Sequence, residues 1–141
     1  MHKFLFLLIF SFGNNFAKSS TLNYPEKSSS DPIKKIVREM AKSNVYEISN
    51  AAGYAGSRSQ QSSRYDQLLK AASTEELTSL ATKHKNPVVR LYAFNALVQK
   101  LKDVPVEIVE QFRNDATIIV VSKNGASGKA PLNSVAEGLL Y

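Results

Sequence analysis

The fold is decided by the stretch Asn86-Pro-Val-Val-Arg-Leu-Tyr-Ala-Phe-Asn-Ala-Leu-Val-Gln-Lys-Leu101. Its first two residues are typical of a helix start: Asn accepts hydrogen bonds from free N–H groups, and Pro has no N–H to leave unpaired. Apolar residues then cover most of the helix circumference, and only a narrow polar stripe with Asn95 and Gln99 interrupts them. A helix that is apolar nearly all round is buried on several sides. We therefore expect this helix to be the centre of the domain.

Four further helices are predicted before this segment. The first begins at Asp31-Pro32, which repeats the cap-and-proline start, and its apolar residues recur at helical spacing. Ser43 or Asn44 can cap a second, short helix. A capping box of Ser73 with Glu76 opens the fourth, which ends near Lys83. The second and third helices are expected over residues 45–52 and 64–72.

The pattern after the central helix is less uniform. A sixth helix is expected to start at Pro105, and a short last helix is expected over 134–140. Residues 117–121 are β-branched throughout, and periodicity alone cannot separate a short buried strand from a buried helical turn there. Residues 123–129 are predicted to form a loop. The fold class is therefore all-α with about six helices, and a short extended segment near 117–121 is left open.

Two neighbouring predicted helices share a regular spacing of small and apolar residues. The first carries Leu77-x-x-Leu80-Ala81, and the second begins with Pro-Val-Val-Arg and continues with Ala and Ala-Leu at fixed steps. Residues 74–101 thereby resemble one HEAT repeat, a helix pair that stacks on similar pairs. The resemblance implies a short HEAT-like α-α superhelix over 31–141. Its repeat residues are Pro87, Val89, Arg90, Ala93 and Leu97.

The resemblance departs from the family at one position. The family usually has an acidic residue six positions before the arginine, and the two pair across repeats; here that position holds His84. We therefore expect Arg90 to bond main-chain carbonyls or a neighbouring carboxylate instead. HEAT-like arrays usually bind other proteins on a curved face, so the resemblance implies a protein partner, although fold does not fix function.

The first residues are typical of an export signal. Met1-His2-Lys3 is basic, and the apolar run from Phe4 to Phe12 is too short to span a membrane, which takes about 20 residues. Residues 1–17 are therefore predicted to be a signal peptide, cleaved after Ala17 or, alternatively, after Gly13. Residues 18–30 are rich in Ser and are predicted to be a disordered linker. With this leader the chain resembles exported HEAT-like proteins of Bacteroidota-type bacteria, and we expect it to be secreted or periplasmic.

The composition excludes several chemistries. The 141 residues allow one small domain, and the absence of Cys excludes a disulfide scaffold, a thiol enzyme and Cys metal ligands. Once the leader is removed, His84 is the only histidine, which leaves too few residues for a Ser-His-Asp triad or a zinc site. The stretch Gly125–Lys129 lacks two positions of the Walker pattern. We predict no catalytic, cofactor or metal residues and a protein that is not an enzyme.

Two segments are candidates for binding. The polar segment 53–63 contains Tyr54 and Arg58 and precedes Tyr65, and Tyr and Arg are favoured at protein interfaces. The sequence has 18 Lys+Arg against 12 Asp+Glu, and a basic stripe lies on the helix that begins at Asp31. This stripe is a candidate anion-contacting face made of Lys34, Lys35, Arg38 and Lys42.

Three functions remain open at this stage. The sequence favours an extracytoplasmic protein-binding or adaptor module whose partner is another protein, with no nucleic acid. The alternative is a binder of anionic envelope lipid or glycan through the basic helix, whose contacts would weaken with salt. The third is an enzyme with an unrecognised site, which would need a deep pocket holding two or more titratable groups of shifted pKa. The sequence identifies neither the partner nor the oligomeric state.

Overall fold

The computed structural model describes residues 30–48 and 58–141. The signal peptide predicted over 1–17, the linker up to residue 29 and the contact residue Tyr54 lie outside the described residues. The described elements run in the order α1–β1–α2–α3–α4–α5–β2–β3–α6. The helices are α1 (Ser30–Ser43), α2 (Gln60–Ala71), α3 (Thr74–Lys83), α4 (Pro87–Lys100), α5 (Val106–Arg113) and α6 (Leu132–Glu137), and the strands are β1 (Val45–Glu47), β2 (Ile118–Lys123) and β3 (Ala126–Pro131).

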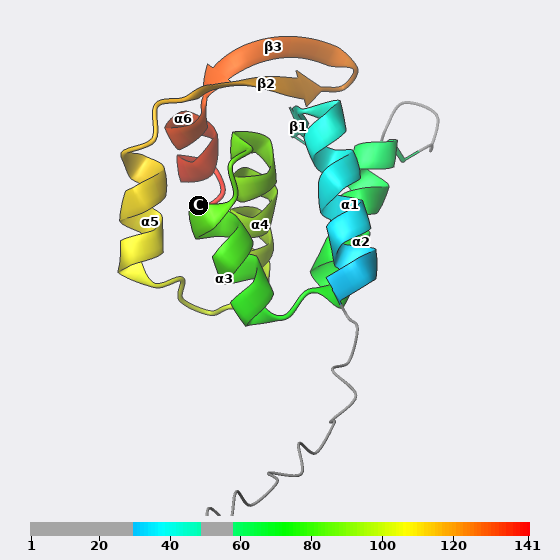
Figure 1. Ribbon diagram of the computed structural model, residues 1–141. Coiled ribbons are helices and arrows are strands. Elements are labelled where there is room, and N and C mark those ends of the chain that lie inside the picture. The colour runs from blue at the N-terminus through cyan, green and yellow to red at the C-terminus, as the bar shows by residue number, and fades with distance from the viewer. Residues whose placement is uncertain (1–29, 49–57) are drawn as a thin grey trace, which may run out of the picture.

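The all-α prediction is wrong, because a three-stranded sheet covers one end of the helices (Figure 1). The strand order is β1-β2-β3, in which β1 runs parallel to β2 and β3 runs antiparallel to it. Val45 lies opposite Val120, so the sheet joins the beginning of the described chain to its end. Residues 31–141 therefore form a mixed α/β fold and not an α-α superhelix. None of the described helices is both long enough and apolar enough to cross a membrane.

The helix predicted over 45–52 is replaced at its start by strand β1. Asn44 has a φ of 50°, and its N–H donates to the carbonyl of Met40 at 3.0 Å. This left-handed residue ends α1, whereas the sequence pattern placed a new helix start there. Tyr46 at the centre of β1 is only 2% exposed, whereas Val45 and Glu47 are half-buried, so β1 places this one side chain in the core.

The loop predicted over 123–129 is a tight β-hairpin. Asn124 and Gly125 have φ values of 52° and 82°, as a two-residue type I′ turn requires. This turn matches the twist of the two strands that it joins, β2 and β3. The extended segment left open near 117–121 is present as β2, which continues to Lys123.

Helix α4 is the centre of the molecule, as predicted. Asn86 caps it by accepting from the N–H groups of Val88 and Val89 at 2.9 and 3.1 Å. Its Phe94 stacks on Phe112 of α5 with ring centroids 4.2 Å apart. The residues named for the repeat pattern share this helix, with Pro87 at its first position and Val89, Ala93 and Leu97 fully buried.

The helices on the N-terminal side of α4 follow local capping signals. The predicted capping box of Ser73 and Glu76 is present at the start of α3. Helix α2 begins at Gln60, earlier than expected, because the side chain of Ser59 accepts from the N–H of Ser62. The last part of the predicted polar loop 53–63 is therefore helical.

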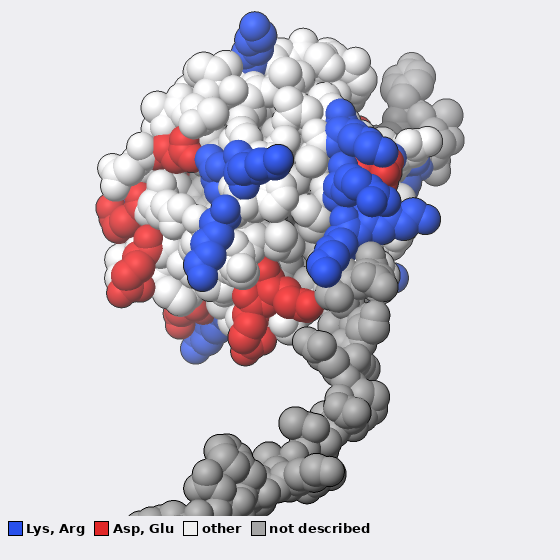
Figure 2. Space-filling view, viewed as in Figure 1, with Lys and Arg blue, Asp and Glu red and all other residues white. Residues whose placement is uncertain are grey.

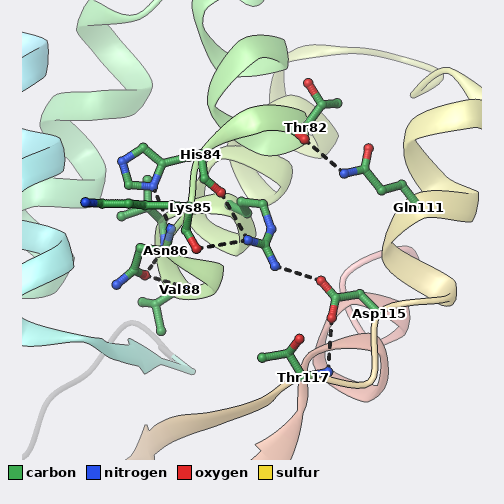
Figure 3. A network of polar contacts seen from close by, with 10 residues as sticks. Thr82, His84, Lys85, Asn86, Val88, Gln111, Asp115 and Thr117 are labelled. Atoms are coloured by element: carbon green, nitrogen blue, oxygen red, sulfur yellow. Dashed lines mark hydrogen bonds and ion pairs between the residues drawn. The ribbon is translucent and has the colours of Figure 1, made fainter.

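Arg90 connects the corner between α3 and α4, at His84 and Lys85, to Asp115, which precedes β2; Figure 3 shows these three partners. Its guanidinium donates to the carbonyls of His84 and Lys85 at 3.0 and 3.3 Å and to the Asp115 carboxylate at 2.8 Å. The expectation that Arg90 bonds carbonyls and a carboxylate is confirmed. Burial raises the pKa of Asp115, but hydrogen bonds from Thr117 and Arg90 lower it more, so the carboxylate is stabilised in its charged form.

His84 is part of the same corner and has a structural role. It ends α3, and its Nδ1 accepts from the N–H of Asn86 at 3.0 Å. Burial lowers the pKa of His84, as do the nearby charges of Lys85 and Arg90. The imidazole is therefore neutral at physiological pH and serves as an acceptor.

Candidate functional site

A groove of about 500 Å³ opens between β1, α2, α4 and the C-terminal residues. Helix α4 contributes the polar stripe seen in the sequence, Asn95 and Gln99, and α2 contributes Tyr65. The facing wall is aliphatic and includes Val135 and Leu139. The groove therefore combines an aromatic and amide side with an apolar side, as small-ligand and peptide sites do.

Three tyrosines whose rings contact one another at a tilt form the aromatic side of the groove. Tyr92 of α4 lies between Tyr46 and Tyr65, with ring centroids 4.6 and 5.6 Å apart. Tyr46 and Tyr92 are each 2% exposed, whereas Tyr65 is half-buried. A ligand would therefore meet Tyr65, and the other two rings support it from behind.

Each of the three phenol oxygens is held by a hydrogen bond. Tyr46 accepts from the amide of Asn95 at 3.0 Å, and Tyr65 accepts from the amide of Gln99 at 2.8 Å. Tyr92 accepts from the N–H of Glu47 at 2.9 Å and donates to the carbonyl of Val45. The aromatic side is thus a fixed surface, which costs little ordering entropy on binding.

The tyrosines of the groove stay protonated at physiological pH. Burial raises the pKa of Tyr46 to about 12, although the hydrogen bond from Asn95 opposes this shift. Burial also raises the pKa values of Tyr65 and Tyr92. The enzyme hypothesis required a pocket that holds two or more titratable groups of shifted pKa, and the groove holds such groups. Their raised pKa values, however, keep the phenols neutral, so they act as hydrogen-bonding groups. Within residues 30–48 and 58–141, no cluster of three or more His, Asp or Glu side chains could hold a metal ion.

Glu47 gives the groove its charge. Its Oε2 accepts from the hydroxyls of Ser59 and Ser62, which ties β1 to the start of α2. Among the described residues that line the groove it is the only charged one, and no Lys or Arg faces it there. The groove consequently favours a ligand that is neutral or basic.

The structure separates the predicted contact residues. Tyr65 lies in the groove, but Arg58 forms an exposed ion pair with Asp66 and does not line it. The sequence analysis missed Tyr46, Tyr92, Asn95 and Gln99 as site residues. For Asn95 and Gln99 the signal was the polar stripe on an otherwise apolar helix, because such a stripe marks the helix face that is not buried in the core.

The predicted basic stripe lies on the outer face of α1. All four of its cations are exposed, and they form the largest blue area in Figure 2. One acid interrupts it: Glu39 bonds Lys42 at 3.0 Å and lies 3.7 Å from Arg38. The hydrogen bond from Lys42 lowers the pKa of Glu39, so this acid stays charged and reduces the positive charge of the face.

Comparisons with known proteins give no further guide to the site. No family model, curated protein or solved structure matches the chain. The resemblance of residues 74–101 to a HEAT repeat therefore stays a prediction. Any assignment of function has to come from the groove and from the charged surfaces.

Proposed function

We propose that the protein is a non-catalytic binding module that holds an extended segment of a partner protein in the tyrosine groove. The observation that carries this proposal is the row formed by Tyr65, Asn95 and Gln99 opposite the aliphatic wall of Val135 and Leu139. The signal-peptide pattern of residues 1–17 supports a location outside the cytoplasm.

The amide side chains of the groove suit an extended main chain. Asn95 and Gln99 are one helical turn apart, which places such side chains about 5–6 Å from each other. An extended peptide repeats its main-chain groups every two residues, at about 6.6 Å. The carbonyl oxygen of Gln99 and the hydroxyl proton of Tyr65 have no partner among the described residues, so an acceptor and a donor face the ligand.

The proposal is tested by selecting peptides from a random display library on the full chain. We expect enriched peptides that are neutral or basic, because Glu47 is the charge that they meet. Calorimetric titration of such a peptide should show binding that weakens at least about tenfold in Tyr65→Ala and in Gln99→Ala, equivalent to about 1.4 kcal/mol.

The matched control is Gln67→Ala. Gln67 is an exposed amide on α2 that bonds Ser63 and does not line the groove. This variant should bind the peptide as the unmodified chain does. Failure to enrich any peptide, or enriched peptides that bind Tyr65→Ala and Gln99→Ala unchanged, would contradict the proposal.

A second candidate function is binding to an anionic envelope surface through α1. The observation that favours it is the exposed set of four cations on one helix face (Figure 2). Vesicles that contain phosphatidylglycerol should then sediment the full chain at low salt and release it as salt screens the contact. Reversing Lys34 and Lys35 to Glu should abolish sedimentation, whereas reversing Lys70 and Lys83, exposed on other helices, should not.

A further inference from the structure

The two edges of the sheet differ in whether side chains hydrogen-bond their outward-facing backbone groups. At the β1 edge, the carbonyl of Val45 accepts from the Gln61 amide at 2.9 Å and from the Tyr92 hydroxyl at 3.3 Å. The N–H of Glu47 donates to the same hydroxyl at 2.9 Å. Gln61 is 5% exposed and is the one buried polar side chain in the described part of the chain. The β1 edge is therefore closed by side chains that replace a neighbouring strand.

At the β3 edge, no side chain of the described residues takes this role. The N–H of Leu132 donates to the carbonyl of Thr117, and hydrogen-bonded pairs alternate along an antiparallel ladder. The N–H and C=O groups of Ala130, Gly128 and Ala126 therefore also point toward β2. Those of Ser127 and Lys129 point away from β2. Among residues 30–48 and 58–141, no hydrogen bond outside the ladder reaches these outward groups.

We propose that the β3 edge accepts an extended, acidic segment of a partner protein as a fourth strand of the sheet. Pairing to an open edge supplies main-chain hydrogen bonds for affinity, and alternate side chains supply specificity. Residues 126–129 are exposed, and the first three are Ala, Ser and Gly, so no large side chain shields the backbone. Ile118, at 59% exposure, lies one strand further in, on β2 opposite Pro131.

The positive charge of the β2–β3 hairpin favours an acidic partner. Residues 118–131 include Lys123 and Lys129 and no acidic residue. In Figure 2 the top of the molecule, where β2 and β3 lie, is mostly uncharged, with a small basic area. A second copy of β3, paired antiparallel with Lys129 opposite Lys129, would place like charges directly opposite each other, which is unfavourable. A segment that alternates acidic and β-branched residues fits this charge and the extended geometry of a strand.

The test uses the isotope-labelled full chain and a synthetic peptide that alternates Val and Glu over about eight residues, within the usual length of a strand. We expect the peptide to slow amide exchange at Ser127 and Lys129 by at least about tenfold. Exchange at Gly128 and Ala130 should change little, because these N–H groups already bond β2. A peptide with Lys in place of Glu should give no protection.

Three variants show whether the protection depends on the β3 edge. Ser127→Pro removes an outward N–H and should abolish protection by the peptide, whereas Ser127→Ala keeps that N–H and should preserve it. Lys129→Glu keeps every backbone group and should weaken binding of the acidic peptide, which covers the case in which Ser127→Pro does not fold. No protection at Ser127 and Lys129, equal protection by the Lys peptide, or protection that rises with protein concentration without peptide would overturn the proposal. Because β3 does not line the tyrosine groove, these outcomes are independent of the groove's ligand.

Discussion

At the scale of single residues, the buried tyrosines make stability depend on alkaline pH. An unfolded tyrosine loses its proton near about pH 10, whereas folding raises the pKa of Tyr46 to about 12. Between these values the folded chain binds more protons, so the free energy of unfolding falls as pH rises. The Tyr46 shift corresponds to about 2–3 kcal/mol. Urea unfolding across this range should show a smaller pH slope in Tyr46→Phe. Tyr141→Phe, which changes a fully exposed ring, should keep the original slope.

A second prediction at this scale concerns the guanidinium of Arg90. Arg90→Lys keeps the charge but loses the fork that reaches two carbonyls and Asp115 at once. The side chains of the pair are only 17% and 23% exposed, so we expect a loss of about 1–3 kcal/mol in urea unfolding. Arg58→Lys affects an ion pair whose arginine is 68% exposed and should cost less than about 0.5 kcal/mol. Equal losses in the two variants would contradict the prediction that the Arg90 fork adds more stability than an exposed ion pair.

At the scale of elements, the two glycines of the β2–β3 hairpin should respond differently to substitution. Gly125→Ala forces a Cβ into a φ of +82° and should cost about 1 kcal/mol, even though no atom lies within 4 Å of that position. Gly128→Ala also meets no neighbour, but its φ is not positive, so reduced freedom of the unfolded chain should make it neutral or stabilising by up to about 1 kcal/mol. Urea unfolding of both variants measures the difference. Equal effects would contradict the type I′ turn.

The elements also show what the sequence could and could not predict. Helices α3 and α4 were predicted correctly because their caps, at Ser73 and Asn86, act within one turn. The dipeptide Asn124-Gly125 is a strong hairpin signal that the prediction passed over. Strand β3 has no β-branched residue, so only pairing with β2 makes it extended. The groove was largely hidden, because its tyrosines come from three elements that meet only in the folded chain.

At the scale of the whole molecule, α4 and the parallel β1–β2 pair join both ends of the described chain into one cooperative unit. The ring of Tyr92 of α4 packs against Tyr46 of β1 and Tyr65 of α2, while Phe94 of the same helix stacks on Phe112 of α5. Met40 of α1 and Leu132 of α6 are fully buried in the core at opposite ends of the described sequence. Truncating either one to Ala should therefore lower the stability of the entire fold by about 2–5 kcal/mol.

Circular dichroism measures this coupling, because the tyrosine signal reports on the cluster and the amide signal reports on all helices. In both Met40→Ala and Leu132→Ala, the two signals should change together in a single urea transition. If Met40→Ala shifted the tyrosine signal while part of the helical signal kept its original midpoint, the two parts would unfold independently. The shared faces of α4 argue against that result, because removing α1 and β1 would expose Tyr92 and leave β2 without its parallel neighbour.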